Sequence, residues 1–456
     1  MRGYGPRSWA LAAVVVLAPH GARADGAFPN GQSVLAPADR PGEIILATNF
    51  GLVSTMDGGR TWLWSCEQAA TSYGHLYQMG PAPADRLYAV STGKLVFSDD
   101  DACDWQTAGG LLAAQLAEDL FVDPSDGARV LAAGLAAGDG GTFYTVLEST
   151  DGGATFDRTL YTAAPGDLVT GVEIAASDPT LIDVALSHGA AGAPTLARST
   201  DGGATWALTD LTAAVGAGQL RIVAIDPSDA DRVFLRAIRA AGDALAISED
   251  NGSVTVPLTL PAGSLVAFIR TAAGTLLAAG TSYGGPVLYR SLDGGASFAP
   301  IAGAPPVLAL GARAGTVYAA TDSTVVPFAE ASSTDEGETW SPGMAFTSVA
   351  AIEPCVKAAC QSDCAARAAQ QQWPAAMCAA APPSADPPDA GLDAQLPGDV
   401  VVGQPVDAST VLDAGDVPRT PRPMGCSCAV TPAGPGGGAL LLLAAGVLFQ
   451  RRRRRP

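Results

Sequence analysis

One short motif returns seven times along this chain at nearly even spacing. Its best copies read T-M-D-G-G-R-T-W at positions 55–62 and S-T-D-G-G-A-T-W at positions 199–206. The motif aspartates are Asp57, Asp100, Asp151, Asp201, Asp250, Asp293 and Asp335, and they stand 42 to 51 residues apart. A repeat of that length is typical of proteins in which each copy is one supersecondary unit that packs on its neighbours. The repeat therefore constrains the fold class more strongly than composition does.

Each motif lies among four short apolar runs that are separated by turns. In the second repeat, the runs 76–79 and 87–90 flank a turn rich in proline and aspartate, and the run 95–98 leads into the motif. A fourth run follows the motif, as at 205–208 in the fourth repeat. Four antiparallel strands in about 45 residues are typical of a propeller blade. The sequence thus predicts an all-β, seven-bladed β-propeller over residues 25–346, closed into a ring without open edges at its ends.

The motif itself predicts a tight hairpin. Its aspartate can accept backbone N–H groups of the turn, Gly203 can take a positive φ, and Trp206 can pack between neighbouring sheets. Two copies depart from the pattern: glycine and threonine are replaced in the second, and threonine and the aromatic residue in the fifth. The replacing residues are Ala102, Asp104, Val254 and Thr255. We expect less regular hairpins in those two blades.

The pattern S/T-x-D-x-G-x-T-W resembles the Asp-box, or BNR repeat, of sialidases, of the sorting receptor sortilin, of xyloglucan-cleaving glycoside hydrolases and of a photosystem assembly factor. The resemblance covers the seven repeats. It implies that each motif hairpin joins the two outer strands of its blade, so that the seven aspartates are structural rather than catalytic or metal-binding. The F/Y-R-I-P sequence of sialidases is absent. The xyloglucan-cleaving enzymes use two facing propellers, whereas this chain has one set of repeats.

The first 24 residues predict a signal peptide that is removed on export. Arg2 and Arg7 give a positive start, an apolar stretch follows at 10–18, and Ala22-Arg23-Ala24 is a small-residue cleavage site. The apolar stretch is too short to span a bilayer. An exported chain enters a compartment in which disulfides persist.

The last residues, 425–456, resemble the myxobacterial C-terminal sorting signal (MYXO-CTERM). Gly425 and Cys426 come first, an apolar stretch follows at 436–449, and five arginines end it at 451–455. The resemblance implies a sorting protease that acts on this tail, lipid on a cysteine, and display on the cell surface with anchoring to the outer membrane. Cys428 is an alternative to Cys426 as the modified residue. An ordinary membrane anchor is the other interpretation, although fourteen helical residues rise only about 21 Å against a hydrocarbon core of about 30 Å.

Between the propeller and the tail, the composition changes twice. Residues 347–381 are rich in alanine and cysteine and predict a short helical segment, and residues 382–424 are rich in proline, alanine and aspartate and predict a disordered linker. The segment contains four cysteines, for which three disulfide pairings are possible, and their spacing does not fit a zinc knuckle. Pairing of Cys66 with Cys103 in the first two blades stays open. The disulfide candidates are Cys355, Cys360, Cys364, Cys378, Cys66 and Cys103.

The charge of the chain limits the kinds of partner. The formal net charge is −19, and the two terminal segments are basic, so the remainder is strongly acidic. Nucleic acid is not an expected partner, because neutralising phosphates needs lysine and arginine. No D-x-D-x-D-G calcium loop occurs, and neither His75 nor His188 has a second histidine at ligand spacing. We expect no metal and no cofactor, and we expect a monomer.

In propellers that this chain resembles, ligands meet the face opposite the motif hairpins. The loops of that face are expected at 66–75, 134–144, 188–194, 279–286 and 321–330. The candidate ligand-binding residues in these loops are Tyr73, His75, Asp139, Tyr144, His188, Tyr283 and Asp322. Tyrosine and histidine supply stacking and polar contacts that suit sugars or peptides. Simple exposed loops, rich in glycine and alanine, are the plainer interpretation of the same residues.

The sequence therefore favours a non-catalytic propeller at the cell surface that acts as a recognition or adhesion module for a protein or a glycan. No residue is assigned a catalytic role. An exported carbohydrate-active enzyme of the glycoside hydrolase type and an envelope assembly factor are the alternatives. A glycoside hydrolase needs two carboxylates about 5–10 Å apart across a cleft. Two convergent carboxylates with perturbed pKa values would favour the enzyme.

Overall fold

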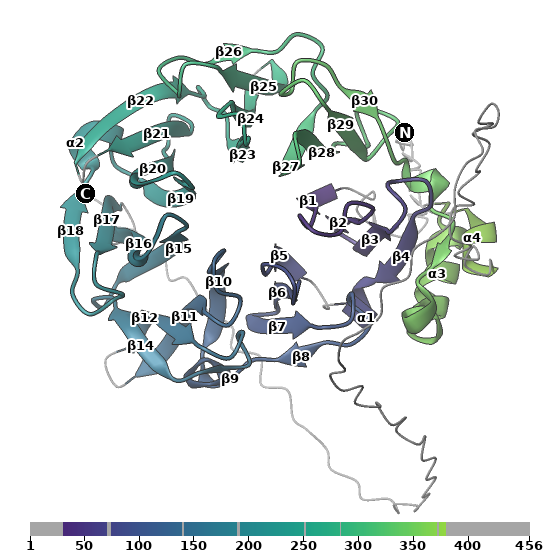
Figure 1. The fold of residues 1–456 in the computed structure, drawn as a ribbon, viewed down its shortest axis with the longest axis horizontal. Coiled ribbons are helices and arrows are strands. Elements are labelled where there is room, and N and C mark those ends of the chain that lie inside the picture. Colours follow the sequence, from purple (N-terminus) through teal and green to yellow (C-terminus); the bar gives the residue numbers. More distant parts are fainter. Residues whose placement is uncertain are drawn as a thin grey trace, which may run out of the picture. The chain divides into compact units, whose positions relative to one another are not determined.

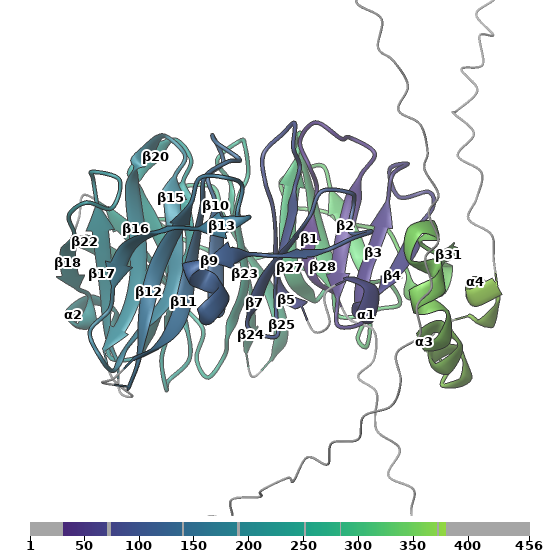
Figure 2. The same cartoon turned by 90° about the horizontal axis from the view of Figure 1, so that it is seen from below.

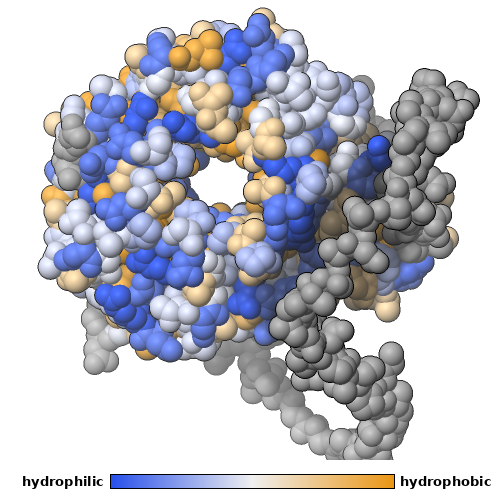
Figure 3. Space-filling view, in the orientation of Figure 1, coloured by the Kyte–Doolittle hydropathy of each residue, from blue (hydrophilic) through white to orange (hydrophobic). Residues whose placement is uncertain are grey.

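The computed structural model describes residues 31–70, 74–138, 141–188, 192–249, 252–282, 284–371 and 374–379. Within these residues, seven antiparallel sheets stand around a central axis like the blades of a propeller (Figure 1). The side view shows the sheets as one thick ring (Figure 2). The space-filling view is open at its centre, so a channel runs along the axis (Figure 3). The predicted all-β, seven-bladed propeller is confirmed.

Each blade contains four main strands in chain order, which we name A to D from the channel outward. Blades 1 to 4 are formed by β1 (Gly31–Leu35), β2 (Ile44–Thr48), β3 (Gly51–Thr55) and β4 (Leu63–Cys66); β5 (Gly74–Met79), β6 (Leu87–Ser91), β7 (Lys94–Ser98) and β8 (Gln106–Thr107); β10 (Leu116–Val122), β11 (Val130–Gly138), β12 (Gly141–Ser149) and β14 (Arg158–Thr162); and β15 (Asp167–Ala175), β16 (Asp178–His188), β17 (Ala193–Ser199) and β18 (Ala207–Asp210). Blades 5 to 7 are formed by β19 (Gln219–Asp226), β20 (Asp229–Ile238), β21 (Ala244–Glu249) and β22 (Ser253–Thr259); β23 (Leu265–Arg270), β24 (Leu276–Ser282), β25 (Gly285–Ser291) and β26 (Ala299–Pro300); and β27 (Val307–Arg313), β28 (Thr316–Thr321), β29 (Glu330–Ser333) and β30 (Ser341–Pro342).

The connections between blades contain a few short elements. These are α1 (Glu67–Ala70), η1 (Leu111–Ala114), α2 (Thr212–Val215) and β9 (Gly109–Gly110), and β9 pairs in parallel with β13 (Thr155–Phe156), which precedes the outer strand of blade 3.

Because strands alternate in direction, the A–B and C–D turns lie on one side of the ring, which we call the motif face. The B–C loops and the connections between blades lie on the other side, which we call the loop face.

The second strand of a blade is buried on both sides. All positions of β2, with the sequence I-I-L-A-T, and of β6, with the sequence L-Y-A-V-S, are buried. Such strands are almost continuously apolar because neighbouring sheets cover both of their faces. The space between blades 2 and 3, for example, is filled by a cluster that includes Tyr88, Leu120 and Phe156. The core is therefore a set of apolar layers between blades rather than one central mass.

Every innermost strand contains a β-bulge against the second strand of its blade. The register shifts at positions 32, 75, 118, 170, 223, 266 and 308. A bulge leaves one residue unpaired and increases the local twist of the strand. The sevenfold repeat therefore extends to a backbone irregularity that the apolar pattern does not reveal.

The ring closes between blades 7 and 1 without exchange of strands, because blade 1 takes all four of its A–D strands from the N-terminal end. Arg313, at the end of β27, spans this seam. Its guanidinium donates hydrogen bonds to the carbonyl oxygens of Pro37 at 3.3 Å, Arg40 at 3.0 Å and Pro41 at 2.7 Å, and to that of Glu43. One buried side chain thus fixes the first A–B turn of the chain against its last blade.

Residues 346–379 form a segment against the outer edge of blade 1, which we call the clasp. It contains η2 (Phe346–Ser348), β31 (Ala351–Ile352), η3 (Pro354–Val356), α3 (Lys357–Ala369) and α4 (Ala375–Ala379). β31 pairs in parallel with β4 and adds a fifth strand to blade 1. Trp62 and Trp64 lie in the same apolar cluster as Val356 and Met377 of the clasp. The predicted helical cysteine-containing segment is confirmed, and it is continuous with the propeller core.

All six cysteines proposed for disulfides form them, in a pairing that the sequence did not give. Cys66 pairs with Cys360, Cys103 with Cys355, and Cys364 with Cys378. Pairing of Cys66 with Cys103 is wrong, and so is pairing of the four clasp cysteines only with one another. The physical reason is that the clasp folds back onto blades 1 and 2, which brings Cys355 and Cys360 beside cysteines more than 250 positions earlier in the chain. Sequence spacing contains no signal for that approach.

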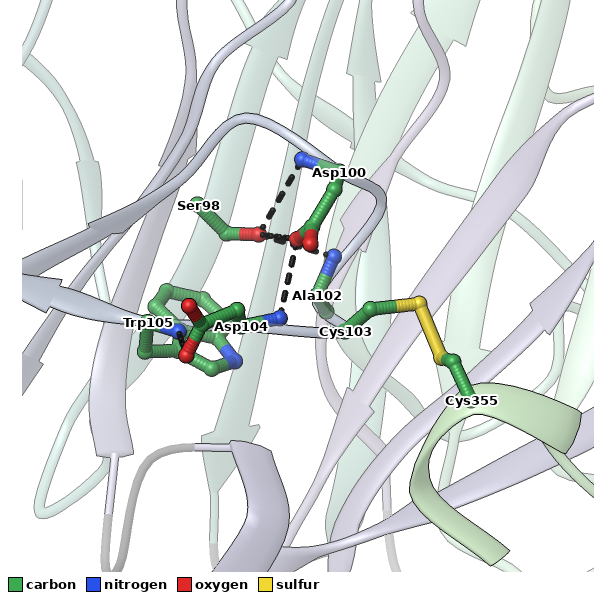
Figure 4. The surroundings of a disulfide bond; sticks show 7 residues. All are labelled: Ser98, Asp100, Ala102, Cys103, Asp104, Trp105 and Cys355. Atoms are coloured by element: carbon green, nitrogen blue, oxygen red, sulfur yellow. Dashed lines mark hydrogen bonds between the residues drawn. A yellow bond between two sulfur atoms is a disulfide. The ribbon is translucent and has the colours of Figure 1, made fainter. Parts of the chain in front are cut away.

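The expectation of an irregular hairpin in blade 2 is also wrong. Asp101 and Ala102 take positive φ values of 56° and 70°, as the two glycines do in other copies. Ser98 donates to Asp100 at 2.8 Å, and Asp100 accepts the N–H of Asp104 at 2.9 Å (Figure 4). The neighbouring disulfide from Cys103 to Cys355 holds the turn against the clasp (Figure 4). We infer that this cross-link offsets the backbone strain of two non-glycine residues at positive φ.

Several predictions concern segments outside the described residues. These are the signal peptide at 1–24, the linker at 382–424, and the tail at 425–456 with Cys426 and Cys428. Among the helices that the structure does describe, none is long and apolar enough to cross a membrane.

Candidate functional site

The motif aspartates organise turns. Asp201 of blade 4 accepts the Ser199 hydroxyl at 2.8 Å, the Thr205 N–H at 2.8 Å and the Thr205 hydroxyl at 2.6 Å. These hydrogen bonds, the one from the Thr205 hydroxyl first, lower the pKa of Asp201 to about 2. Gly203 has a φ of 87°, as the motif predicts. A carboxylate whose two oxygens are occupied in this way holds a hairpin.

The same hairpins lie on separate blades. Each of the six described aspartates sits in the C–D turn of its own blade on the motif face, and Asp250 is outside the described residues. No three histidine, cysteine, aspartate or glutamate side chains of the described residues are grouped so that they could hold a metal ion. The motif therefore positions blades and forms no shared site in this part of the chain.

The seven candidate ligand-binding residues are only partly described. His188 lies at the end of β16 and Asp322 in the B–C loop of blade 7, both on the loop face, whereas Tyr144, which the sequence places in a loop, lies within β12 and packs against an apolar core cluster. His75 lies in β5, and its side chain is outside the described set. Tyr73, Asp139 and Tyr283 also lie outside it. The structure thus brings two candidates, Tyr144 and His188, to neighbouring blades, and it places Asp322 on another blade.

Blades 3 and 4 present a small polar and aromatic cluster on the loop face. Nδ1 of His188 lies 2.7 Å from the carboxylate of Asp167, and the His188 side chain is 38% exposed. Burial raises the pKa of Tyr144, and the nearby charge of Glu118 raises it further. Nearer the motif face, Tyr161 meets Trp206 of the blade 4 motif edge to face, with 5.2 Å between the ring centroids, and the Trp206 indole N–H donates to the carbonyl oxygen of Leu160 at 3.0 Å. These side chains can offer hydrogen bonds and ring edges, and they include no activated nucleophile.

Asp322 has a local structural role. Its carboxylate accepts the Thr324 N–H at 2.9 Å and the Thr324 hydroxyl at 2.6 Å, which is the geometry of an Asx turn. Both bonds stabilise the B–C loop of blade 7. That loop matters because it forms one wall of a cavity.

The cavity of about 340 Å³ lies between blades 6 and 7 and is formed largely by the loop face. Its lining residues share an apolar character and contain no acid or base. They are Pro286, Gly303, Ala304, Pro305, Pro306, Val325, Val326, Phe328 and Trp340. Val325 is 61% exposed at its rim. The indole N–H of Trp340 is already bonded to the carbonyl of Gly337 at 2.9 Å, so the cavity offers shape and apolar surface rather than reactive groups.

Two carboxylates with raised pKa values lie in the inner strands of blades 3 and 4. Asp119 accepts the N–H of Val172 in the next blade at 3.0 Å, and Glu173 accepts that of Ile225 at 2.9 Å. Burial raises the pKa of Asp119 to about 6 and that of Glu173 to about 8, and the charge of Asp119 adds to the shift at Glu173. In both cases the carboxylate serves as a brace from one blade to the next.

Sequence reasoning missed the cavity and the braces for different reasons. The cavity had a signal, since the loop 321–330 contains V-V-P-F and the preceding connection contains P-P-V, but polarity as a criterion for ligand-binding residues does not select apolar ones. Asp119 and Glu173 had none, because nothing local marks which residue of an inner strand faces the next blade.

Comparison with solved structures finds several proteins of low similarity. An ancestral GH74 enzyme matches with a TM-score of 0.49 and 13% identity, over 69% of this chain and 46% of that one. A puromycin-hydrolysing peptidase of Mycobacterium tuberculosis matches with a TM-score of 0.49 and 13% identity, over 70% and 55%. A GH74 xyloglucanase from Xanthomonas campestris matches with a TM-score of 0.37 and 16% identity, over 72% and 59%. This chain spans about half the length of these proteins, and at such identities the likeness concerns the fold alone. No protein-family model and no curated protein matches the sequence.

Proposed function

We propose that this protein is a non-catalytic recognition module, displayed on the cell surface, whose loop face binds a partner. The observation that carries the proposal is the apolar cavity between blades 6 and 7, which is large enough for a side chain or a short segment and contains no ionisable group. Buried apolar surface and aromatic anchors are what protein-recognition sites use. A segment of a partner protein with an exposed apolar side chain therefore fits better than a glycan, which needs several hydrogen-bonding groups.

Binding through this face can be tested with two matched substitutions. Val325→Asp introduces a charge at the rim of the cavity, and Met56→Asp introduces the same charge on the motif face at a residue of similar exposure, 61% against 55%. The full exported chain and both variants would be applied to peptide and glycan arrays. We expect peptides with apolar anchors to bind, Val325→Asp to weaken that binding and Met56→Asp to leave it unchanged. Equal effects of the two substitutions, or binding to glycans alone, would contradict the proposal.

The proposed surface display rests on the two terminal signals. Export would remove residues 1–24, a sorting protease would process the tail, and lipid on Cys426 or Cys428 would hold the protein at the outer membrane. Mass spectrometry of the protein isolated from cells would test this. We expect a mature N-terminus near Asp25 and a C-terminal peptide that ends near the cysteines and is increased in mass by lipid. An intact arginine tail in the mature protein would contradict it.

A glycoside hydrolase is the second candidate, and one observation favours it. Asp119 and Glu173 lie in adjacent inner strands and have raised pKa values, which is a property of catalytic acids. Their hydrogen bonds to backbone N–H groups of the next blade favour the structural role instead. Turnover of a polysaccharide that is lost in Glu173→Gln, with the fold retained, would establish the enzyme. Absence of turnover across plant and bacterial polysaccharides would support the recognition module.

A further inference from the structure

The outer edge of one blade in this molecule accepts an additional strand. The last strand of a blade pairs with its neighbour on one side only, and its other edge faces outward. In blade 1, β31 covers that edge by pairing in parallel with β4, with Ala351 opposite Leu63. Next to blade 3, β9 pairs in parallel with β13, with Gly109 opposite Thr155, in a separate two-stranded sheet that leaves the outer edge of β14 uncovered among the described residues. Blade 1 thus shows what kind of segment fits at an outer edge, namely a short extended one in the parallel sense.

Blade 5 has the longest outer strand that is not covered. β22 contains seven residues, against five in β14, four in β18 and two each in β8, β26 and β30. It lies on the rim of the ring (Figure 1), and no other strand of the described residues pairs with its outer edge. Proteins usually protect such edges with charges, prolines, bulges or very short strands. β22 has the sequence S-V-T-V-P-L-T, with no charge. Its second half contains Pro257 and a register shift against β21, so that residues 253–256 are the part of the edge without such protection.

An acidic cavity lies beside this strand. It has a volume of about 500 Å³ and lies between blades 5 and 6, and Thr255 of β22 forms part of its wall. Its charged lining consists of four carboxylates and one guanidinium, which belong to Asp229, Asp231, Glu249, Asp293 and Arg232. Glu249 is 56% exposed and lies 3.4 Å from Nε of Arg232, and Asp231 is paired with Arg198 at 2.9 Å. Hydrogen bonds from the Ser297 hydroxyl and N–H lower the pKa of Asp293 to about 2, so that it is ionised at neutral pH. The four carboxylates outnumber the guanidiniums paired with them, so that the lining keeps an excess of negative charge.

We propose that the outer edge of β22 and the adjoining acidic cavity bind an extended basic segment of a partner protein. The partner's main chain pairs with β22 in the parallel sense already seen at β4. Side chains of an added strand alternate between the two faces of the sheet, so that every second one is directed toward blade 6. A lysine or arginine at such a position enters the cavity and meets the excess negative charge. This surface lies apart from the loop-face cavity and does not depend on it.

The test uses the full exported chain and synthetic peptides. The probe is a nine-residue peptide of alternating threonine and valine with one central lysine, labelled for fluorescence polarisation. Two companions replace the lysine by glutamate or methylate alternate backbone nitrogens. We expect the lysine peptide to bind, and each companion to bind about tenfold more weakly or not at all, because one lacks the charge and the other the N–H groups for strand pairing.

Substitutions on the protein locate the site. Thr255→Lys places a positive charge at the edge of β22, and Glu249→Gln removes one carboxylate of the cavity. Both should weaken binding of the lysine peptide, whereas Leu208→Lys on β18, at a residue 53% exposed, is the matched control and should not. Val325→Asp at the loop-face cavity should also have no effect, which separates this proposal from the proposed function. Absence of lysine-peptide binding, binding that survives N-methylation, or equal effects of Thr255→Lys and Leu208→Lys would overturn the inference.

Discussion

Blades 1 and 2 differ from blades 5 and 6 in whether other segments cover and cross-link their outer surfaces. The outer strand of blade 1 is covered by β31, and two disulfides join blades 1 and 2 to the clasp. Blade 5 has a longer outer strand with no cover among the described residues and a cavity lined by carboxylates beside it. The blades arise from the same repeat, so the repeat alone does not decide their roles. The roles of the blades depend instead on segments outside the repeat, such as the clasp.

This difference separates the part of the ring that closes it from the part that presents edges and loops to a partner. A propeller without strand exchange needs a strong closure at one place, and here the closure lies where blades 7 and 1 adjoin. The rest of the rim is then free to present edges and loops.

The largest effect is expected from the disulfide that joins the distant ends of the ring. Replacing Cys66 and Cys360 together by serine should cost about 2–5 kcal/mol of unfolding free energy, because the cross-link spans 294 positions. Replacing Cys364 and Cys378, which are 14 positions apart, is the matched control and should cost less. Urea unfolding without reductant measures both. Equal losses would show that the clasp does not close the ring.

A somewhat smaller effect is expected at the seam. Arg313→Met leaves several buried carbonyl oxygens without their donor and should cost about 2–4 kcal/mol. Arg290→Met removes only a 3.4 Å ion pair with Glu338, which is 66% exposed, and should cost about 0–1 kcal/mol. If both variants unfold at the same urea concentration, Arg313 does not stabilise the contact between blades 7 and 1 as we propose.

The pH dependence should separate the braces from the motif hairpins. Burial raises the pKa of Glu173 to about 8 and the pKa values of Glu43 and Glu330 to about 7. The folded state therefore holds protons that the unfolded state releases, so that stability is fully present below about pH 4.5 and is lost as the pH rises through 7 to 8. The aspartates with lowered pKa values, such as Asp201, act in the opposite direction and lose their contribution as the pH falls from about 4 to about 2.

Thermal unfolding across this range is the measurement. We expect a maximum of the melting temperature in mildly acidic solution and a decline toward pH 9. Glu173→Gln should flatten the alkaline part of that decline, and Glu338→Gln, at a residue that is 66% exposed, is the control without effect. A profile that rises steadily from pH 5 to pH 9 would contradict the assignment of buried protonated carboxylates.

The smallest effect is expected at two adjacent glycines of one hairpin. Gly202 and Gly203 both have positive φ, 69° and 87°, but a Cβ on Gly203 would lie 3.1 Å from the side chain of Leu160, whereas a Cβ on Gly202 would meet nothing within 4 Å. Each change to alanine should cost about 1 kcal/mol through the backbone. Gly203→Ala should cost a few tenths more, since the contact with blade 3 must adjust. Equal losses would show that the hairpin does not pack on its neighbour.

The repeat allowed the fold to be predicted because each motif specifies a local hairpin and its spacing specifies a four-stranded unit. Asp201 and Gly203 behave as the motif chemistry requires. The pairing of Cys66 with Cys360 could not be predicted, since it depends on where a helical segment docks on the ring. The regular hairpin at Ala102 could not be predicted for the same reason, because the cross-link to which we attribute its regularity lies partly outside the motif.

The candidate site was predicted less well. The resemblance predicts the face on which a ligand binds, and polarity predicts the ligand-binding residues on it. Polarity selects Asp322, which forms a turn, and does not select the apolar Val325 and Phe328 beside it. The acidic cavity beside β22 combines residues from two blades. Such a combination depends on the angle between neighbouring sheets, which a single sequence does not encode locally.

The clasp also determines how the molecule would respond to tension. A pull on the chain beyond Ala379 enters through the bond between Cys378 and Cys364 and passes along α3 to the bond between Cys360 and Cys66. The force therefore reaches blade 1 through covalent links, in addition to the backbone path through blade 7 that chain order alone would provide. A propeller tethered by its C-terminus and loaded at its rim would then be stretched across its ring instead of being unwound blade by blade.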